Sequence, residues 1–388
     1  MTILIVTDYY PPDRIGGVGT IAHGLAVAYR ARGHRVLVLT TGTSSGERDV
    51  IRGARNLGWG VLTNNVRALR IIRREGVQLV HLHQSGTTLF LLARRFMRNF
   101  PVVLDSLQVS YVSEAREIRA HAVRGRRIAP GLREYVEKLV LAPAHVFLDF
   151  IGFTSSDAVT TVSRDNQREI ESTYGRVASR TVTVVPNGVS ASGATMDFRD
   201  SALEDRLRGR TVIAHIGVFR ARKRVANLVL AFAEIAARCP GALLLLVGGG
   251  RGYEPRLRAL VADLGIADRV VFTGSVPPAR VPYYLSLVDV FCLLSSYEGM
   301  PMALLEAMQL GKAVIATNGY GMRDLLEEGD GGVLVPVDDI GATAAALEQL
   351  VRDPLRRRVL GEAALARVQA QFSWDRIARQ YLALAERS

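Results

Sequence analysis

Residues 290–317 read VFCLLSSYEGMPMALLEAMQLGKAVIAT, and this stretch decides the fold. It contains an apolar run at 290–294, a polar loop, a helix opened by Pro301 as a first helical residue, and a second apolar run at 313–316. The apolar runs are continuous rather than alternating, which is typical of strands covered on both faces. A strand, a helix and a strand in this order predict two parallel strands joined by a right-handed crossover.

The same alternation runs along the whole chain. Strands are expected at residues 3–7, 36–40, 79–82, 102–104, 158–162, 182–185, 212–216, 243–247, 270–272, 290–294, 313–316 and 333–335. The break between two halves falls in PNGVSASGATMDFRDS, residues 186–201, which is rich in Gly, Ser, Asn and Asp. We therefore predict two α/β domains with parallel sheets, residues 1–190 and 191–372. They should face each other across a cleft at the carboxyl ends of the strands, where such folds bind ligands.

Length and composition indicate a globular protein and argue against a disordered, membrane-spanning or disulfide-rich one. The chain has 388 residues, 48% of them hydrophobic and 22% charged, so it is too long for one ordinary domain and too apolar to be disordered. No apolar run approaches the ~20 residues that span a bilayer. The first residues, MTILIVTDYYPP, indicate a strand rather than a signal peptide. Two cysteines, Cys239 and Cys292, argue against a disulfide framework or a zinc site, and we expect a cytoplasmic protein.

Basic residues are concentrated in the first half of the chain. Residues 1–190 hold 25 Arg and Lys against 15 Asp and Glu, whereas residues 191–388 hold 24 against 22. A basic half can attract nucleic acid, an anionic membrane surface or a phosphorylated substrate. The arginines lie in helical stretches without interleaved aromatic residues or a recognition motif, so we do not expect a nucleic-acid partner.

Two motifs follow predicted strands at positions suited to anion binding. GGVG, residues 16–19, precedes the first helix, where backbone N–H groups can approach an anion. A plain tight turn explains the same glycines. GVFRARKR, residues 217–224, places Arg220, Arg222 and Lys223 at the carboxyl end of a strand. These cations are either a solvated surface run or a clamp for a diphosphate.

Residues 290–317, quoted above, give the most specific indication of a binding site. Glu298 lies in the loop before the helix, and the free amides of Gly299 to Ala303 could hold phosphate oxygens. Glu306 lies in the second helical turn among apolar neighbours, so we expect it to be partly buried. A buried carboxylate needs a partner. A pair of sugar hydroxyls would serve, and capping of neighbouring amides is the structural alternative.

Together these motifs resemble glycosyltransferase family 4, the retaining, nucleotide-sugar-dependent transferases of the GT-B fold, which has two Rossmann-like domains. The similarity covers nearly the whole chain: GGVG at 16–19, H-x-H at 81–83, TVS at 161–163, VPNGV at 185–189, the Lys223 loop, VGGG at 247–250, FTGSV at 272–276, E-x7-E at 298–306 and FSW at 372–374. The resemblance implies transfer of a hexose from a nucleoside-diphosphate sugar to an acceptor hydroxyl. It also implies that the last helix, residues 373–388, packs back onto the first domain.

The family pattern assigns roles by position. Glu298 would bind hydroxyls of the donor sugar, and Glu306 would bind the ribose hydroxyls. Lys223 and the backbone of residues 299–302 would hold the diphosphate, which the glycines of the first domain would approach from the opposite side. Val276 would line the base pocket. By the same resemblance, the substrate-binding residues at the diphosphate are Gly16, Gly17, Gly299, Met300, Pro301 and Met302.

Two positions depart from the family pattern. The family usually has Arg where this chain has Val218, and we hypothesise that Arg220 or Arg222 supplies the missing charge. Asp105 lies where a family pattern ending in H-S-L has a histidine. We assign Asp105 a catalytic or acceptor-binding role there.

His81 and His83 lie at the end of a predicted strand. We expect them to point to opposite faces of the sheet. One would then be packed in the core, and the other, His83 with Gln84, would face the cleft as a substrate-binding residue.

No metal-binding D-x-D motif lies in a suitable setting, so we predict activity without a metal ion or other cofactor. Cations and a helix N-terminus would replace the divalent ion. The basic first half favours a phosphorylated or lipid-linked acceptor, reached by docking the arginines of 116–133 on the inner face of a membrane. A small polar natural-product or aminocyclitol acceptor is the alternative. A nucleotide-sugar epimerase or hydrolase of the same fold, with Asp105 and His83 as acid and base, is a further one.

Overall fold

The computed structural model describes residues 1–12, 17–42, 49–54, 59–83, 87–108, 121–123, 126–128, 142–175, 181–190, 198–250, 252–326 and 331–388. The chain divides into two compact units. The first comprises residues 1–113, 139–190 and 372–388, and the second comprises residues 114–138 and 191–371. Each unit has its own parallel sheet, which confirms the predicted α/β class.

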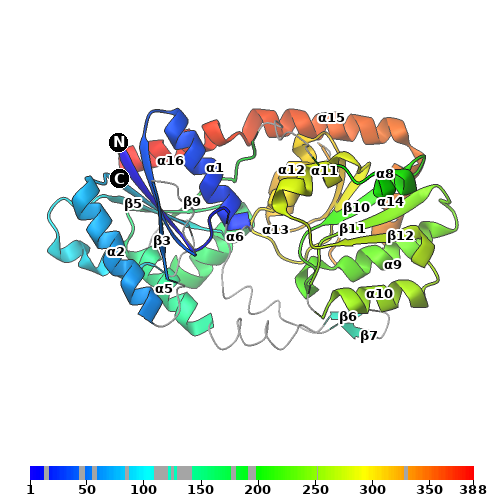
Figure 1. Ribbon diagram of the computed structural model, residues 1–388, viewed down its shortest axis with the longest axis horizontal. Helices are drawn as coiled ribbons and strands as arrows, with labels where there is room; N and C mark the ends of the chain where they lie inside the picture. Colours follow the sequence, from blue (N-terminus) through cyan, green and yellow to red (C-terminus); the bar gives the residue numbers. More distant parts are fainter. Residues whose placement is uncertain are drawn as a thin grey trace. The chain divides into compact units, whose positions relative to one another are not determined.

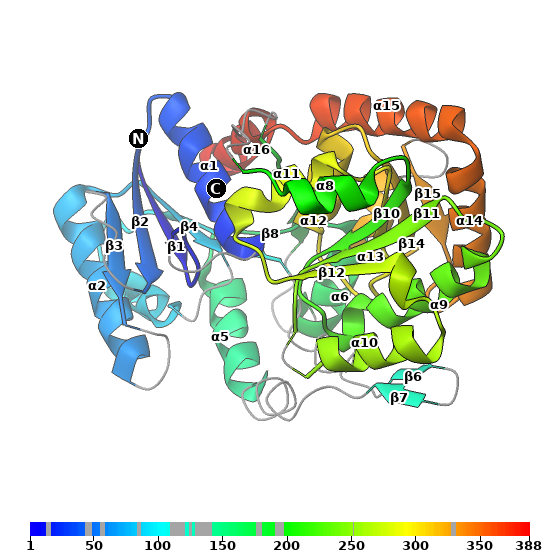
Figure 2. The same ribbon diagram turned by 45° about the vertical axis from the view of Figure 1, so that its right-hand side comes forward.

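The sheet of the first unit has seven strands in the order β3-β2-β1-β4-β5-β8-β9, and all neighbours are parallel. Figure 2 shows β3, β2, β1 and β4 at one side of this sheet. The strands are β1 (Thr2–Thr7), β2 (Arg35–Thr41), β3 (Val50–Gly53), β4 (Leu79–His83), β5 (Val102–Leu107), β8 (Ala158–Thr161) and β9 (Val182–Val184). The helices are α1 (Gly17–Ala31), α2 (Trp59–Glu75), η1 (Leu89–Phe96), α5 (Ala142–Ser155), α6 (Arg164–Ile170), η3 (Glu171–Gly175) and α16 (Trp374–Arg387).

The last helix, α16, packs beside α1 within the first unit (Figure 1). A Cβ atom added to Gly24 of α1 would lie 2.2 Å from the indole of Trp374, so the absence of a side chain lets the two helices approach. Arg32 forms an ion pair of 2.7 Å with Asp375. The hydroxyl of Tyr381 lies 3.0 Å from that of Ser106 on β5.

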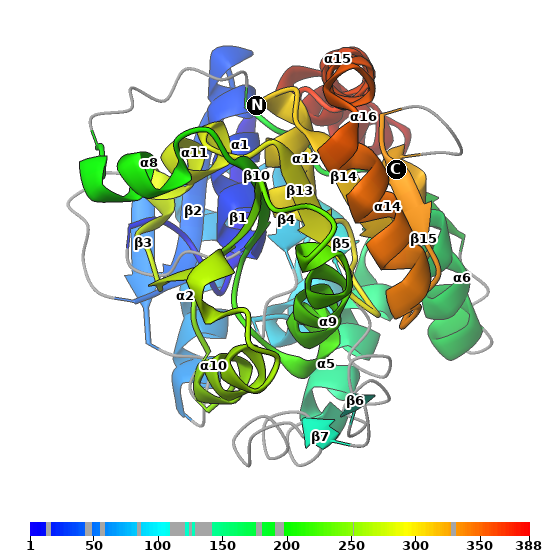
Figure 3. The ribbon, with the colours of Figure 1, turned by 90° about the vertical axis from the view of Figure 1, so that its right-hand side faces the viewer.

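The sheet of the second unit has six parallel strands in the order β12-β11-β10-β13-β14-β15. They are β10 (Thr211–Ile216), β11 (Ala242–Val247), β12 (Val270–Gly274), β13 (Val290–Leu293), β14 (Ala313–Thr317) and β15 (Val333–Val335). The main helices are α8 (Ser201–Leu207), α9 (Val225–Ala236), α10 (Glu254–Asp263), α11 (Val281–Ser286), α12 (Met302–Gln309), α13 (Tyr320–Leu326), α14 (Ile340–Arg352) and α15 (Pro354–Gln371). Helices α9 and α14 pack together on the sheet, as Figure 3 shows.

Short elements complete the second unit. They are the antiparallel pair β6 (His121–Val123) and β7 (Arg126–Ile128), with η4 (Ala221–Lys223), η5 (Ala267–Arg269) and η6 (Pro278–Arg280). Most of the arginine-rich stretch 116–133, for which membrane docking was predicted, lies outside the described residues.

All of the expected strands are present, with ends shifted by at most three residues. The sequence did not predict β3, a short edge strand in which Arg52 interrupts the apolar pattern. Pro301 is the N-cap residue of α12, in an extended conformation, and the helix begins at Met302. The predicted helix start was therefore one residue too early.

Candidate functional site

Two loops of the second unit leave the same edge of its sheet. Strands β10 and β13 are parallel neighbours, so their carboxyl ends meet. The loop after β10 contains η4, and the loop after β13 leads to α12. The backbone N–H of Ser296 donates to the carbonyl of Arg222 at 2.8 Å, which ties one loop to the other.

Glu298 is the centre of a buried charge cluster between these loops. Its side chain is 9% exposed, and its Oε1 atom forms ion pairs with Nη1 of Arg222 at 3.0 Å and with Nζ of Lys223. Nη1 of Arg222 also donates to the carbonyl of Tyr297 at 2.7 Å. The structure thus brings together three residues for which the sequence predicted roles at the donor.

The charged groups of this cluster change one another's pKa values. Burial alone would raise the pKa of Glu298, but the cations Arg222 and Lys223 outweigh it and lower that pKa to about 2. Burial lowers the pKa of Lys223, although Glu298 opposes the shift. Two cations therefore face one carboxylate, and the cluster carries a surplus positive charge next to the sheet edge.

A second ion pair holds the cationic loop in place. Arg224 adopts a left-handed conformation with φ of 50°, which is uncommon for a residue with a side chain. Its Nε donates to Asp338 at 2.9 Å, and its Nη1 donates to the carbonyl of Ala221 at 2.9 Å. Asn227 donates to the same Asp338 oxygen at 2.9 Å. This network fixes the turn that presents Arg222 and Lys223.

Arg220 differs from its neighbours because its side chain is exposed. Its positive charge contributes to the lowered pKa of Lys223, after burial and Arg222. The structure thus places Arg222, rather than Arg220, in the buried cluster. Whether either residue replaces the arginine that the family has at Val218 stays a prediction.

The N-terminus of α12 lies directly after Glu298 in the chain. Pro301, the N-cap residue, makes no side-chain hydrogen bond to this helix, and the first N–H groups of any helix lack intrahelical acceptors. Gly321 of α13 supports the loop, since a Cβ atom there would lie 1.9 Å from the carbonyl oxygen of Gly299. The predicted diphosphate residues Gly299, Met300 and Pro301 thus lie on a loop that is packed against α13, and Met302 begins α12.

Glu306 lies on the second turn of α12 and is half-buried. Burial raises the pKa of this carboxyl to about 7. Its side chain has no hydrogen-bond or ion-pair partner in the described part of the chain. Such a group gains from a ligand that offers hydroxyl donors.

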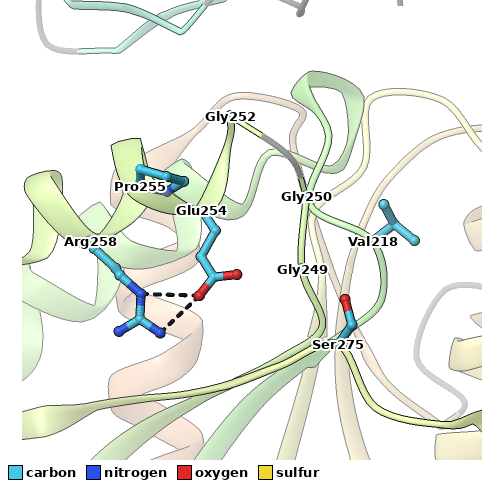
Figure 4. A pocket seen from close by; sticks show the side chains of 8 residues that line it. All are labelled: Val218, Gly249, Gly250, Gly252, Glu254, Pro255, Arg258 and Ser275. Carbon is cyan, nitrogen blue, oxygen red and sulfur yellow. Dashed lines mark hydrogen bonds and ion pairs between the residues drawn. The ribbon is translucent and has the colours of Figure 1, made fainter.

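A pocket of about 580 Å³ opens at the ends of β10, β11 and β12 (Figure 4). It is lined by Val218, Gly249, Gly250, Gly252, Glu254, Pro255, Arg258 and Ser275. Val276, the predicted base-pocket residue, follows Ser275 and is half-buried. The sequence prediction missed Glu254 and Arg258, although their i, i+4 spacing after the VGGG motif was a readable signal.

The histidine prediction was wrong about orientation. His81 and His83 point to the same face of the sheet, with ring centroids 4.1 Å apart, because residues two apart in a strand share a face. His81 accepts or donates a hydrogen bond at 3.1 Å with Tyr29. His83 is fully buried, and neither of its ring nitrogens has a partner among the described residues. Burial lowers the pKa of His83 to about 3, so the ring is neutral at pH 7.

The remaining residues predicted in the first unit have different surroundings. Gly16 lies outside the described residues, as does Gln84, and Gly17 is exposed at the start of α1. Asp105 is 2% exposed in the middle of β5, and a Cβ atom on Gly152 of α5 would lie 2.3 Å from its carboxylate. Burial raises its pKa to about 7. Asp105 is therefore enclosed under α5, in the middle of β5 rather than at its end.

Within the described residues, no group of three or more His, Cys, Asp and Glu side chains is placed to hold a metal ion. The same part of the chain includes no helix with the length and apolar character needed to cross a membrane.

Comparison with known proteins identifies the family. The model described as Glycosyltransferase Family 4 matches residues 15–192, and the model described as Glycosyl transferases group 1 matches residues 201–367. The chain belongs to glycosyltransferase family 4. The resemblance found in the motifs is thus confirmed, and this family 4 protein is a nucleotide-sugar-dependent glycosyltransferase.

Relatives of this family 4 enzyme use several donors and acceptors. It is 27% identical over 397 residues to the GDP-mannose-dependent alpha-(1-6)-phosphatidylinositol monomannoside mannosyltransferase of Mycobacterium tuberculosis, covering 97% of this chain and 96% of that protein. It is 33% identical over 252 residues to the D-inositol 3-phosphate glycosyltransferase of Acidothermus cellulolyticus, covering 60% and 55%. It is 38% identical over 170 residues to the N-acetyl-alpha-D-glucosaminyl L-malate synthase of Bacillus anthracis, covering 44% of each.

Solved structures agree on the fold. Sucrose-phosphate synthase from Thermosynechococcus elongatus matches with a TM-score of 0.78 and 23% identity, covering 100% of this chain and 98% of that one. Anabaena HepE, solved in complex with UDP and glucose, matches with a TM-score of 0.76 and 19% identity over the full length of both chains. The enzyme has the GT-B fold that the motifs predicted.

Proposed function

We propose that this enzyme moves a hexose from a nucleoside-diphosphate sugar to a hydroxyl of an inositol-type acceptor, phosphorylated or lipid-linked, with retention of anomeric configuration. The observation that carries the proposal is the buried cluster of Arg222 and Lys223 around Glu298 beside the uncapped N-terminus of α12. Relatives that use GDP-mannose, phosphatidylinositol mannoside or inositol 3-phosphate support the substrate classes.

In the proposed reaction, the bond from the anomeric carbon to the diphosphate oxygen breaks while the acceptor oxygen bonds to the same face. The acceptor proton passes to the departing phosphate. Negative charge grows on the departing oxygen, and cations already fixed in place stabilise it without reorganisation. Glu298 pairs with Lys223 and Arg222 in the absence of a donor, which holds these cations in position. In the proposal it then shares its oxygens with hydroxyls of the donor sugar.

Glu306 completes the proposed donor site. Its carboxyl group is half-buried and lacks a protein partner in the described chain, which suits a pair of ribose hydroxyls. Because burial raises its pKa to about 7, donor binding should strengthen as the group ionises between pH 6 and 8.

Surface features of the first unit support a membrane-bound acceptor. Helix α2 exposes Leu62 and Val66, which are 50% and 46% exposed, followed by exposed arginines toward its end. The neighbouring η1 exposes Leu92 and Phe96, which are 54% and 89% exposed. Apolar side chains beside arginines suit the interface of an anionic bilayer.

The enzymatic test offers the protein a panel of GDP-, UDP-, ADP- and dTDP-sugars with phosphatidylinositol vesicles or soluble inositol phosphate, and identifies products by mass spectrometry. The expected result is glycosyl transfer that K223A lowers by at least about 100-fold in kcat/KM. The R352A variant removes an exposed arginine of α14 and serves as the control. Full activity of K223A would contradict the proposed site. Transfer to the soluble acceptor alone would favour a small polar acceptor.

The membrane test is sedimentation with vesicles containing anionic lipid. We expect the double variant L62S/V66S to bind less than the wild type, and binding to weaken at high salt. V27S removes a 50% exposed valine of α1 and is the matched control. Equal sedimentation of all three proteins would exclude this face as the contact.

A further inference from the structure

The pocket at the ends of β10, β11 and β12 is floored by backbone rather than side chains. A Cβ atom on Gly249 would lie 2.6 Å from Oγ of Ser275, and one on Gly250 would lie 2.2 Å from the carbonyl oxygen of Phe219. Both glycines are therefore required by close packing of three loops. No side chain projects from these two glycines into the pocket, and Val218 offers an apolar contact beside them.

One carboxylate faces this floor from the side. Glu254 begins α10, and its side chain is 23% exposed. Arg258 donates to it twice, from Nε at 3.0 Å and from Nη2 at 2.8 Å, and both bonds go to Oε1. The guanidinium group of Arg258 also lies over the ring of Phe272, 4.3 Å from its centroid. Arg258 is thus held between a carboxylate and an aromatic ring, and it fixes the orientation of Glu254.

The second carboxylate oxygen is left for a ligand. Oε2 of Glu254 has no hydrogen-bond donor among the described residues, and it is turned away from Arg258 toward the space between Gly249 and Val218 (Figure 4). A Cβ atom on Gly249 would lie 3.5 Å from this oxygen, so the oxygen sits at the edge of the floor. A ligand lying on the floor would meet an acceptor that can only receive hydrogen bonds.

A free carboxylate oxygen at this position can distinguish the bases of nucleotide sugars by their hydrogen-bond donors. Guanine presents two adjacent donors, N1–H and the N2 amino group. Uracil and thymine present one N–H between two carbonyl acceptors, and adenine presents an amino group beside an acceptor nitrogen. The one free oxygen, Oε2, can accept hydrogen bonds from the two adjacent donors of guanine together, whereas it repels the carbonyl oxygens that flank the N–H group of uracil or thymine.

The geometry points to Glu254 as the residue that selects guanine, and hence a GDP-sugar, in this pocket. The inference rests on the proposed function, because it assumes that a nucleoside diphosphate binds along this edge of the sheet. Arg258 is the positioning residue, which acts through Glu254. The GDP-mannose dependence of the Mycobacterium tuberculosis relative is compatible with this choice.

The test is calorimetric titration of the wild type, E254Q and the control E362Q with GDP, inosine diphosphate and UDP. Inosine diphosphate lacks only the N2 amino group. We expect the wild type to bind GDP about ten-fold or more tightly than inosine diphosphate or UDP. In E254Q the preference for GDP over inosine diphosphate should fall to about three-fold or less. E362Q, which alters an exposed Arg–Glu pair at the same spacing on α15, should behave as wild type.

The outcomes separate this inference from the proposed function. Wild type that binds no nucleoside diphosphate would overturn both. GDP binding with an unchanged preference in E254Q would overturn only the role of Glu254. An equal loss for all three ligands would show that Glu254 contacts the ribose or phosphates instead. Titration with 2′-deoxy-GDP completes the test, because the effect of E254Q should persist there, and its disappearance would assign Glu254 to the ribose.

Discussion

Removing the charge of Glu298 should destabilise the second unit by an amount that can be worked from the structure. The carboxyl has a pKa of about 2 in the folded chain, against an ordinary value of 4.5. A carboxyl whose pKa falls this far on folding stabilises the folded state by about 3 kcal/mol at pH 7. E298Q keeps the shape and removes the charge, leaving Arg222 and Lys223 without their counter-ion. We expect the free energy of unfolding to fall by about 3 kcal/mol.

The sign of the pH dependence gives a second check. Because the folded pKa is depressed, the stabilisation is present above pH 4.5 and is lost as the pH falls toward 2. The difference between wild type and E298Q in urea unfolding, followed by circular dichroism, should therefore shrink to about half at pH 3. E362Q serves as a control that leaves stability unchanged. Equal stability of wild type and E298Q at pH 7 would refute the account of this cluster.

Three further perturbations have defined outcomes. E306Q should raise the melting temperature at pH 8 and weaken donor binding, because a carboxyl whose pKa rises on folding from 4.5 to about 7 costs stability increasingly as the pH passes 4.5 and fully above 7; a lower melting temperature would contradict this. G24A should destabilise by about 1–3 kcal/mol through overpacking on Trp374, while G241A, where a Cβ meets nothing within 4 Å, should be neutral in the same thermal melts. EDTA should leave transferase activity within about two-fold; loss that magnesium or manganese restores would show that the Lys223 site does not replace a metal.

The strands were predictable because continuous apolar runs identify strands buried on both faces. The charged loops after β10 and β13 were predictable because charged residues follow such runs directly. β3 was missed because a short edge strand containing Arg52 has no apolar run. The shared face of His81 and His83 was also predictable, because residues two apart in a strand lie on the same face. The expectation of opposite faces misapplied this rule.

Other features depend on contacts between segments that are far apart in the chain, and the sequence alone does not reveal such contacts. The pairing of Glu298 with two cations joins loops that are 75 residues apart in the chain. The enclosure of Asp105 depends on Gly152, which lies on a helix that packs over β5. The free oxygen of Glu254 depends on the contact with Arg258, which occupies only the other oxygen, and the sequence does not show this contact.

A crystal structure of the enzyme with a bound GDP-sugar tests the central claim most directly. The account predicts phosphate oxygens within about 3.2 Å of Nζ of Lys223 and of the N–H of Met302, with the ribose hydroxyls on Glu306. A diphosphate that contacts neither Lys223 nor the N-terminus of α12 would contradict it.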